Sequence, residues 1–218
     1  MTGLALIQHE ADAIDYCQKY NLNEHKTIIP VPFSQTDDKL EIMKDHLSCN
    51  LNGKRVLDIG ANKGFFTVYT ASRGASVTAV EPLPRNADLI RKIAGYFKLN
   101  NIEVINSKFN AALLKLGKFD IIILGSCYHY LYDDLKGHDN VFSIIAQLSN
   151  GILLFEGPLT MDDEYLFKYA KDAHWSEEYI ESFTKFKILD TAAKYFTTIS
   201  CLGKTKYTPD RFVYLITK

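Results

Sequence analysis

The chain has 218 residues, of which 47% are hydrophobic and 23% charged, so it can bury a full core and is not disordered. Lys and Arg total 25 against 26 Asp and Glu, and this net charge of -1 argues against a protein that grips nucleic acid through its phosphates. The four cysteines share no close spacing, which argues against a zinc ribbon and a disulfide scaffold. Apolar stretches are only strand-sized and the N-terminus lacks the basic start of a signal peptide, so we expect a cytoplasmic protein with no membrane partner.

The first fifty residues are expected to be mainly helical. Apolar residues recur at three- and four-residue steps from Leu4 to Cys17, which is typical of an amphipathic helix. A second helix is predicted after Pro30 and Pro32, with Thr36 or Asp37 as its cap. We expect a single domain, in which residues 1–50 form an N-terminal helical lid or cap on a core of residues 51–218.

From residue 55 the pattern predicts strands that alternate with helices. The predicted strands are 55–59, 76–80, 102–107, 119–125 and 151–155, and the predicted helices 65–72, 86–97, 141–148 and 161–171, with Ser176 capping another. Strands separated by helices of this length form a parallel sheet. Two β-rich runs, 196–202 and 211–217, are joined by a turn-rich segment and predict an antiparallel hairpin. The predicted fold class is therefore α/β, with seven mostly parallel strands, a C-terminal antiparallel hairpin and helices on both faces.

The most informative segment is the glycine-containing turn that joins the strand 55–59 to the next helix. It runs Asp58-Ile59-Gly60-Ala61-Asn62-Lys63-Gly64-Phe65. It lacks the second and third glycines of a dinucleotide fingerprint and the Lys-Ser/Thr of a Walker loop, which disfavours NAD and ATP. Glu81 ends the next predicted strand, 21 residues after Gly60, where a carboxylate can accept both hydroxyls of a ribose.

These residues resemble the class I S-adenosylmethionine-dependent methyltransferases. The matching elements are Asp58-x-Gly60-x-Asn62-x-Gly64, Glu81 at the following strand end, and Phe119-Asp120 opening the fourth strand. The run 58–67 together with Glu81-Pro82 is most similar to the FkbM-type O-methyltransferases. The resemblance covers residues 50–218 and implies a Rossmann-like fold, S-adenosylmethionine as the cofactor and S-adenosylhomocysteine as its product.

The resemblance also implies roles for the residues around the cofactor. Asp58 would help to hold the methionine amino group, the backbone of 60–64 would cradle the carboxypropyl chain, and Glu81 would bind the ribose. Pro82 and Leu83 would flank the adenine, and the adenine amino group would meet the backbone near Lys108 or the ring of Phe109. The expected cofactor-binding residues are Asp58, Gly60, Ala61, Asn62, Gly64, Phe65, Glu81, Pro82, Leu83, Lys108, Phe109, Gly125 and Ser126.

The segment after the fourth strand, Gly125-Ser126-Cys127-Tyr128-His129-Tyr130, is expected to face the transferred methyl group. It lacks the Asn/Asp-Pro-Pro-Tyr/Phe tetrapeptide of the amide N-methyltransferases, which disfavours DNA-base and glutamine methylation. The expected catalytic residues are His129, Glu156 and Tyr128. His129 is the candidate general base, because an imidazole titrates near ~6.5. Glu156 follows the fifth strand and is expected to orient the acceptor or His129, and Tyr128 is divided between core packing and cofactor contact.

Two other groups of residues are given structural interpretations. Cys127 is interpreted as a small buried residue, because methyl transfer needs no covalent intermediate. Asp133, Asp134, His138 and Asp139 are interpreted as a hydrophilic loop, so no metal site is expected.

The predicted function is O-methylation of a small hydroxylated molecule, such as a sugar or another metabolite. An RNA-modifying methyltransferase stays open as an alternative, since a Tyr-His pair at this place is similar to the branch that modifies the tRNA wobble uridine. A non-catalytic adenosyl-binding partner subunit is the third hypothesis. The expected partner is thus a small-molecule acceptor, and the sequence does not determine the oligomeric state.

Overall fold

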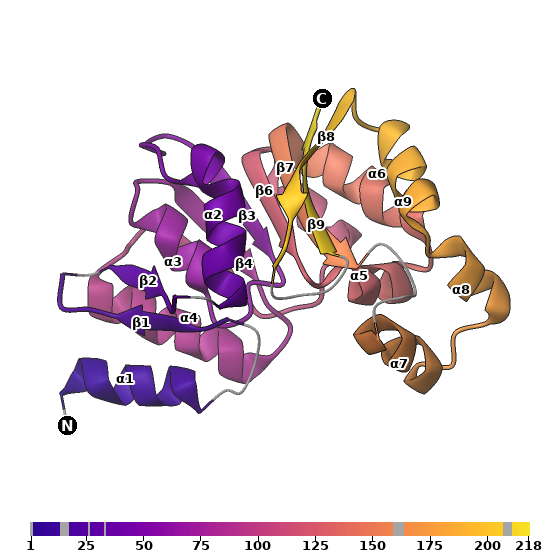
Figure 1. Cartoon of the computed structure of the whole chain (residues 1–218). Coiled ribbons are helices and arrows are strands. Elements are labelled where there is room, and N and C mark those ends of the chain that lie inside the picture. Colours follow the sequence, from indigo (N-terminus) through magenta and orange to yellow (C-terminus); the bar gives the residue numbers. More distant parts are fainter. Residues whose placement is uncertain (1, 14–17, 26, 33, 159–163, 207–210) are drawn as a thin grey trace.

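Seven strands form one sheet in the order β5-β4-β3-β6-β7-β9-β8 (Figure 1). This computed structural model describes residues 2–13, 18–25, 27–32, 34–158, 164–206 and 211–218. The parallel strands are β3 (Arg55–Ile59), β4 (Ser76–Val80), β5 (Ile102–Ile105), β6 (Phe119–Gly125) and β7 (Ser149–Pro158). β9 (Arg211–Thr217) is inserted between β7 and β8 (Thr198–Lys204) and pairs antiparallel with both. The predicted seven-stranded sheet and its C-terminal hairpin are confirmed.

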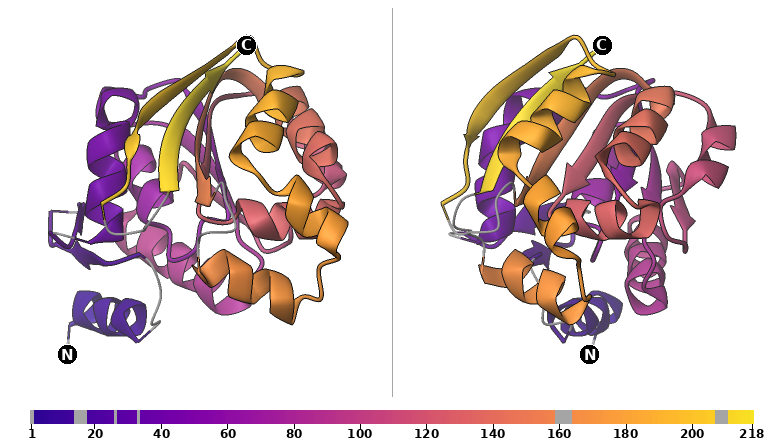
Figure 2. Two further views of the ribbon diagram at one scale, coloured as in Figure 1. Left: turned by 45° about the vertical axis from the view of Figure 1, so that its right-hand side comes forward. Right: turned by 90° about the vertical axis from the view of Figure 1, so that its right-hand side faces the viewer.

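Helices cover both faces of this sheet (Figure 2). The first face packs against α2 (Gln35–Leu47), α3 (Phe65–Ala71) and α4 (Pro84–Phe97). The second packs against α5 (Tyr128–Leu135), α6 (His138–Leu148) and α9 (Lys185–Ala193), and the shorter α7 (Glu164–Asp172) and α8 (Glu177–Ser182) extend this layer. A 3-10 turn, η1 (Ala111–Leu116), joins β5 to β6.

The strands of the sheet centre are buried on both faces, and their side chains alternate between two cores. Ile121 and Ile123 of β6 belong to the cluster that includes α2, α3 and α4, whereas Ile122 and Leu124 belong to the cluster with α5, α6 and α9. Successive side chains of a strand point to opposite faces, so a strand covered on both sides reads as an unbroken apolar run. This explains the unbroken apolar run 121–124 of β6, and the ends of β3, β4 and β6 were predicted correctly.

The N-terminal fifty residues are less helical than predicted. α1 (Gly3–Asp12) is followed by a two-stranded antiparallel sheet of β1 (Tyr20–Leu22) and β2 (Ile28–Pro30), and then by α2. Three-residue strands are too short to show a period-two pattern, and the part of the predicted first helix at residues 14–17 lies outside the described residues. Ser34 caps α2 by accepting a hydrogen bond from the Asp37 amide at 3.2 Å, so the predicted caps Thr36 and Asp37 were wrong.

The interpretation of residues 133–139 as a hydrophilic loop was also wrong. α5 and α6 occupy nearly all of this stretch, and only Lys136 and Gly137 separate them. Both linking residues have positive φ, a conformation that ends one helix and lets the chain turn into the next. Among the described residues, no helix is both long and apolar enough to cross a bilayer.

Candidate active site

The turn between β3 and α3 is joined to the end of β4 by one buried carboxylate. The Asn62 amide donates to Glu81 Oε2 at 2.7 Å, and the Leu83 amide donates to Glu81 Oε1 at 2.9 Å. Burial raises the pKa of Glu81, and these two backbone hydrogen bonds oppose that rise. Asn106, which the sequence analysis missed, donates to the Glu81 and Pro82 carbonyls at 2.8 and 3.0 Å and so fixes the backbone after β4.

The turn itself has an unusual backbone. Gly60, Asn62 and Gly64 all have positive φ, at 69°, 53° and 85°. A Cβ on Gly60 would lie 2.6 Å from Cys127 Sγ, and a Cβ on Gly64 would lie 2.6 Å from Ile90 Cγ1, so both positions require glycine. Asn62 Oδ1 is buried and accepts no hydrogen bond from the part of the chain that the structure describes, which makes it a potential acceptor for a ligand.

Asp58 lies beneath this turn and is buried. Its Oδ2 accepts a hydrogen bond of 2.6 Å from Thr67 Oγ1 in α3. Burial raises the pKa of Asp58 to about 6, although the Thr67 hydrogen bond acts in the opposite direction. Asp58 therefore ties β3 to α3, and its contact with a methionine amino group stays a prediction.

The residues expected near the adenine differ in exposure. Leu83 is 58% exposed beside Glu81, whereas Phe109 is buried. The Lys108 side chain extends to α5, where its Nζ lies 2.6 Å from Asp134 Oδ1. The adenine contacts of Leu83, of the backbone near Lys108 and of the Phe109 ring stay predictions.

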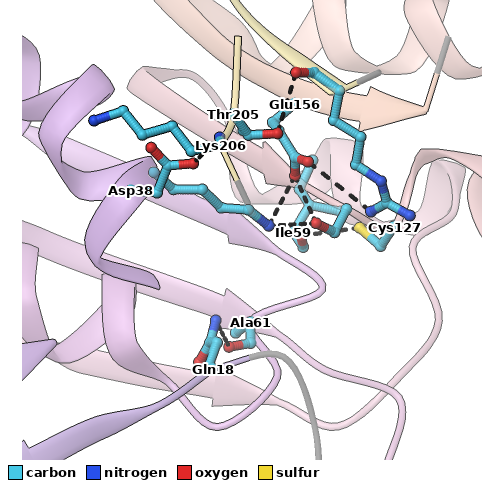
Figure 3. A network of polar contacts seen from close by, with 11 residues as sticks. Gln18, Asp38, Ile59, Ala61, Cys127, Glu156, Thr205 and Lys206 are labelled. Carbon is cyan, nitrogen blue, oxygen red and sulfur yellow. Dashed lines mark hydrogen bonds and ion pairs between the residues drawn. The ribbon is translucent and has the colours of Figure 1, made fainter. Parts of the chain in front are cut away.

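Near the carboxyl ends of β6 and β7, four polar residues from three elements and the loop after β6 meet (Figure 3). We call Lys39, Ser126, Glu156 and Arg211 the acceptor-edge cluster. Ser126 Oγ donates to Glu156 Oε2 at 2.6 Å, and Lys39 Nζ from α2 lies 3.0 Å from the same oxygen and also hydrogen-bonds Ser126 Oγ. Arg211 Nη1 from β9 lies 3.9 Å from Glu156 Oε1.

The charge state of Glu156 follows from these contacts. Burial alone would raise its pKa, but the Lys39 ammonium and the Arg211 guanidinium outweigh burial and hold the pKa below the usual range of a glutamate. Glu156 is thus an ionised carboxylate that is completely buried. Its Oε1 accepts no hydrogen bond from any described residue. The sequence predicted Ser126 and Glu156 from their places after predicted strands, although Glu156 lies within β7, which continues to Pro158. Lys39 and Arg211 were missed, because neither belongs to a motif.

His129 lies in the first turn of α5, two residues after Cys127. Its ring is fully buried, with its centroid 4.1 Å from the Tyr130 ring and 5.0 Å from the Tyr169 ring of α7. Cys127 donates to the Ile59 carbonyl at 3.3 Å, and burial raises its thiol pKa, which favours the structural interpretation of this cysteine.

Tyr128 points into the hydrophobic core rather than toward the glycine turn. Its hydroxyl lies 2.7 Å from His138 Nδ1, and His138 Nε2 lies 2.9 Å from the Ser182 carbonyl. A carbonyl only accepts, so Nε2 carries the proton and Nδ1 accepts from Tyr128, as in a neutral imidazole. Burial lowers the His138 pKa in agreement with that state. The geometry therefore favours the packing role over the catalytic role expected of Tyr128.

The sequence matches one family over most of its length. The family described as "Methyltransferase domain" matches residues 36–197. A curated relative, the O-antigen chain terminator bifunctional methyltransferase/kinase WbdD of Escherichia coli, is 26% identical over 141 residues, which are 62% of this chain and 19% of WbdD. The chain thus spans less than a fifth of the length of the curated relatives it matches.

Solved structures share the fold. EvdMO1 superposes with a TM-score of 0.64 at 12% identity, covering 98% of this chain and 47% of that one. The T. thermophilus 16S rRNA N2 G1207 methyltransferase RsmC, in complex with AdoMet and guanosine, superposes with a TM-score of 0.60 at 17% identity, covering 92% of this chain and 50% of RsmC. The fold prediction is confirmed, and the FkbM branch stays a prediction. Because the family match spans well over half of the chain and includes the glycine turn, Glu81 and Glu156, the chain belongs to the methyltransferase domain family, as a class I domain whose cofactor is S-adenosylmethionine.

Proposed function

We propose that this chain transfers a methyl group from S-adenosylmethionine to an oxygen atom of a small hydroxylated molecule. The proposal depends chiefly on Glu156, an ionised and buried carboxylate at the edge where the acceptor is expected. Its Oε1 is paired with Arg211 at 3.9 Å, beyond hydrogen-bond distance, and accepts no hydrogen bond from the described residues. Buried polar atoms are nearly always hydrogen-bonded, so we assign a hydroxyl of the acceptor as the donor to this oxygen.

The residues around the glycine turn fit the cofactor. Glu81 is placed to accept the ribose hydroxyls, Asn62 Oδ1 is a buried acceptor with no donor among the described residues, and Leu83 offers an exposed apolar surface for the adenine. When bound, the cofactor supplies a methyl group that its sulfonium already activates. The protein then contributes orientation and exclusion of water, which account for much of the acceleration of such a displacement.

Within the acceptor edge we assign different tasks to the two titratable groups. The lowered pKa of Glu156 makes it a weak base, so its task is to orient the acceptor hydroxyl. Lys39 and Ser126 hold that carboxylate in place. His129 is the group we propose to take the hydroxyl proton, because an imidazole titrates near ~6.5.

Methyl transfer to defined acceptors tests this function. Wild-type protein is incubated with methyl-labelled S-adenosylmethionine and, in separate reactions, monosaccharides, polyols, simple phenols, total tRNA and ribosomal RNA. We expect label in a small hydroxylated compound as a methyl ether, which survives mild alkali. Label only in RNA would reject the proposal in favour of an RNA-modifying enzyme. Label in an alkali-labile ester would show that the acceptor is an acid rather than an alcohol.

Glu156→Gln should raise the KM for the acceptor by about 10- to 100-fold, because a hydrogen bond to a charged group contributes about 1.5–3 kcal/mol. The dissociation constant of S-adenosylhomocysteine, measured by calorimetry, should stay within about twofold of wild type. Glu103→Gln is the matched control, since Glu103 is exposed on the far edge strand of the same sheet. An unchanged KM for the acceptor in Glu156→Gln would contradict the assigned role.

Removal of the Glu156 charge leaves Lys39 buried beside a neutral group, and this can destabilise the fold. The double variant Lys39→Gln/Glu156→Gln removes both charges of the pair together. It should bind S-adenosylhomocysteine normally and still show the raised acceptor KM. The double variant therefore separates loss of acceptor binding from loss of folding.

Tyr128→Phe should lower the free energy of unfolding by about 1–3 kcal/mol, because His138 Nδ1 would lose its buried donor. Turnover should change by less than about threefold. Urea denaturation and methyl transfer measure the two effects, and Tyr96→Phe on the exposed side of α4 is the control. A loss of turnover without loss of stability would return Tyr128 to the catalytic residues.

A further inference from the structure

A segment that lies far away in the sequence holds every second residue of the glycine turn, namely Ala61, Lys63 and Phe65. Gln18 Nε2 donates to the Ala61 carbonyl at 3.3 Å (Figure 3). The Phe65 amide donates to Gln18 Oε1 at 3.0 Å. The Tyr20 hydroxyl donates to the Lys63 carbonyl at 2.7 Å. Asn62, between these residues, instead donates its amide to Glu81. One side of the turn therefore faces the N-terminal segment, and the other faces the carboxylate expected to bind the ribose.

The contacts of Gln18 replace a cap that the local sequence does not provide. α3 begins at Phe65, and its N-cap residue is Gly64, which has no side chain to accept a hydrogen bond. Helix N-termini leave amides that need such acceptors. Gln18 supplies the acceptor for Phe65 from 47 residues earlier in the chain and uses its amide nitrogen on the same turn.

The turn also anchors the N-terminal segment. Lys63 is buried, and its Nζ donates to the Ala11 carbonyl at 2.9 Å. Tyr20 is also buried, and its ring lies 6.2 Å from the ring of Phe65, between centroids. The N-terminal segment and the turn are thus one packed unit.

We propose that Gln18 is a positioning residue for the cofactor. Three of the five residues 60–64 have positive φ, and for Asn62 this conformation has an energetic cost that persists only where surrounding contacts hold it. Gln18 sets the distance between the Ala61 carbonyl and the Phe65 amide, and Glu81 holds Asn62 from the opposite side. Removal of Gln18 takes away two of the hydrogen bonds that the N-terminal segment makes to the turn and leaves that of the Tyr20 hydroxyl. It therefore lowers the fraction of molecules with the turn in this conformation. The inference concerns cofactor binding alone and is independent of the acceptor's identity.

Gln18→Met keeps the length of the side chain and removes both hydrogen bonds. We expect the dissociation constant of S-adenosylhomocysteine, measured by calorimetry, to rise about tenfold, the effect of two hydrogen bonds of ordinary strength. Gln8→Met is the matched control. Gln8 lies in the same N-terminal segment and, among the described residues, its side chain bonds within that segment, to Asp12, Tyr20 and Leu22. It should leave this dissociation constant within about twofold of wild type.

Kinetics distinguish positioning from general loosening. In Gln18→Met the KM for S-adenosylmethionine should rise about tenfold, with kcat and the acceptor KM unchanged. Gln18→Glu keeps the acceptor for the Phe65 amide but cannot donate to the Ala61 carbonyl, so it should fall between Gln18→Met and wild type. A wild-type dissociation constant in Gln18→Met would overturn the proposal, as would an equal rise in Gln8→Met. If wild-type protein bound no S-adenosylhomocysteine, the cofactor assignment would fail and the proposal with it.

Discussion

Glu81→Ala should weaken binding of S-adenosylmethionine and S-adenosylhomocysteine by about 100-fold or more. Glu81 accepts hydrogen bonds from the Asn62 and Leu83 amides, so its loss removes the link between the turn after β3 and the end of β4. It also removes the acceptor expected for the ribose hydroxyls. Each hydrogen bond to a carboxylate contributes about 1.5–3 kcal/mol, and two such losses suffice for the predicted effect.

Calorimetry with S-adenosylhomocysteine measures this effect, and NAD and ATP should not compete. Glu81→Gln keeps a single acceptor oxygen and should be intermediate, while Glu103→Ala on the exposed edge should match wild type.

The pH dependence of cofactor affinity gives a second readout. Burial raises the pKa of Glu81, so this carboxylate takes up a proton at a higher pH than an ordinary glutamate does. As the pH is lowered, the affinity for the cofactor should therefore begin to fall at that higher pH. Wild-type affinity in Glu81→Ala would refute the ribose assignment.

The cofactor half of the site was predictable because its signals are local in sequence. The glycines of the turn are required by positive φ and by the contacts of Cys127 and Ile90 with the backbone. Glu81 comes directly after β4, whose β-branched and small residues predict a strand that ends at Val80. A parallel sheet then brings these strand ends to one edge, so the pattern predicts their proximity without any knowledge of the packing.

The acceptor half depends on contacts between segments that are distant in sequence, and most of it was missed. Lys39 lies on a helix that resembles an ordinary surface helix, and Arg211 opens a strand at the end of the chain. Each is notable only because folding buries it against Glu156. Gln18 is a similar case, because a single glutamine carries no motif and its partners Ala61 and Phe65 lie more than forty residues away.

The error at α5 has a related cause. The segment Tyr128–Leu135 mixes aromatic residues with two aspartates, and the aspartates indicated a loop. In the structure, the buried Tyr128 and Tyr132 rings both pack against Phe183, whereas Asp133 is half-buried and Asp134 exposed. Tertiary burial of the aromatic face thus outweighs the weak helix propensity of the acids.

His129→Ala should lower turnover by about 10²- to 10⁴-fold, the usual contribution of a general base, and leave S-adenosylhomocysteine binding nearly unchanged. His129 lies four residues after the end of β6 at Gly125, and it is the only histidine in α5. If its imidazole takes the acceptor proton, wild-type activity should rise with pH over the range in which the ring loses its proton, because only the neutral ring accepts one.

Two further substitutions separate proton transfer from packing. His129→Phe fills the space between the Tyr130 and Tyr169 rings without a basic nitrogen, and His129→Asn keeps hydrogen bonding without a proton acceptor near neutral pH. Both should show the same loss of turnover as His129→Ala, and neither should show the rise with pH. Near-full turnover in His129→Asn would mean that the ring only positions the acceptor and that orientation supplies the acceleration. Recovery of turnover in His129→Phe would mean that His129 only packs between the Tyr130 and Tyr169 rings. Loss of S-adenosylhomocysteine binding in all three variants would place the ring in support of the adenosyl pocket, and the proton would then need an acceptor elsewhere on the same edge.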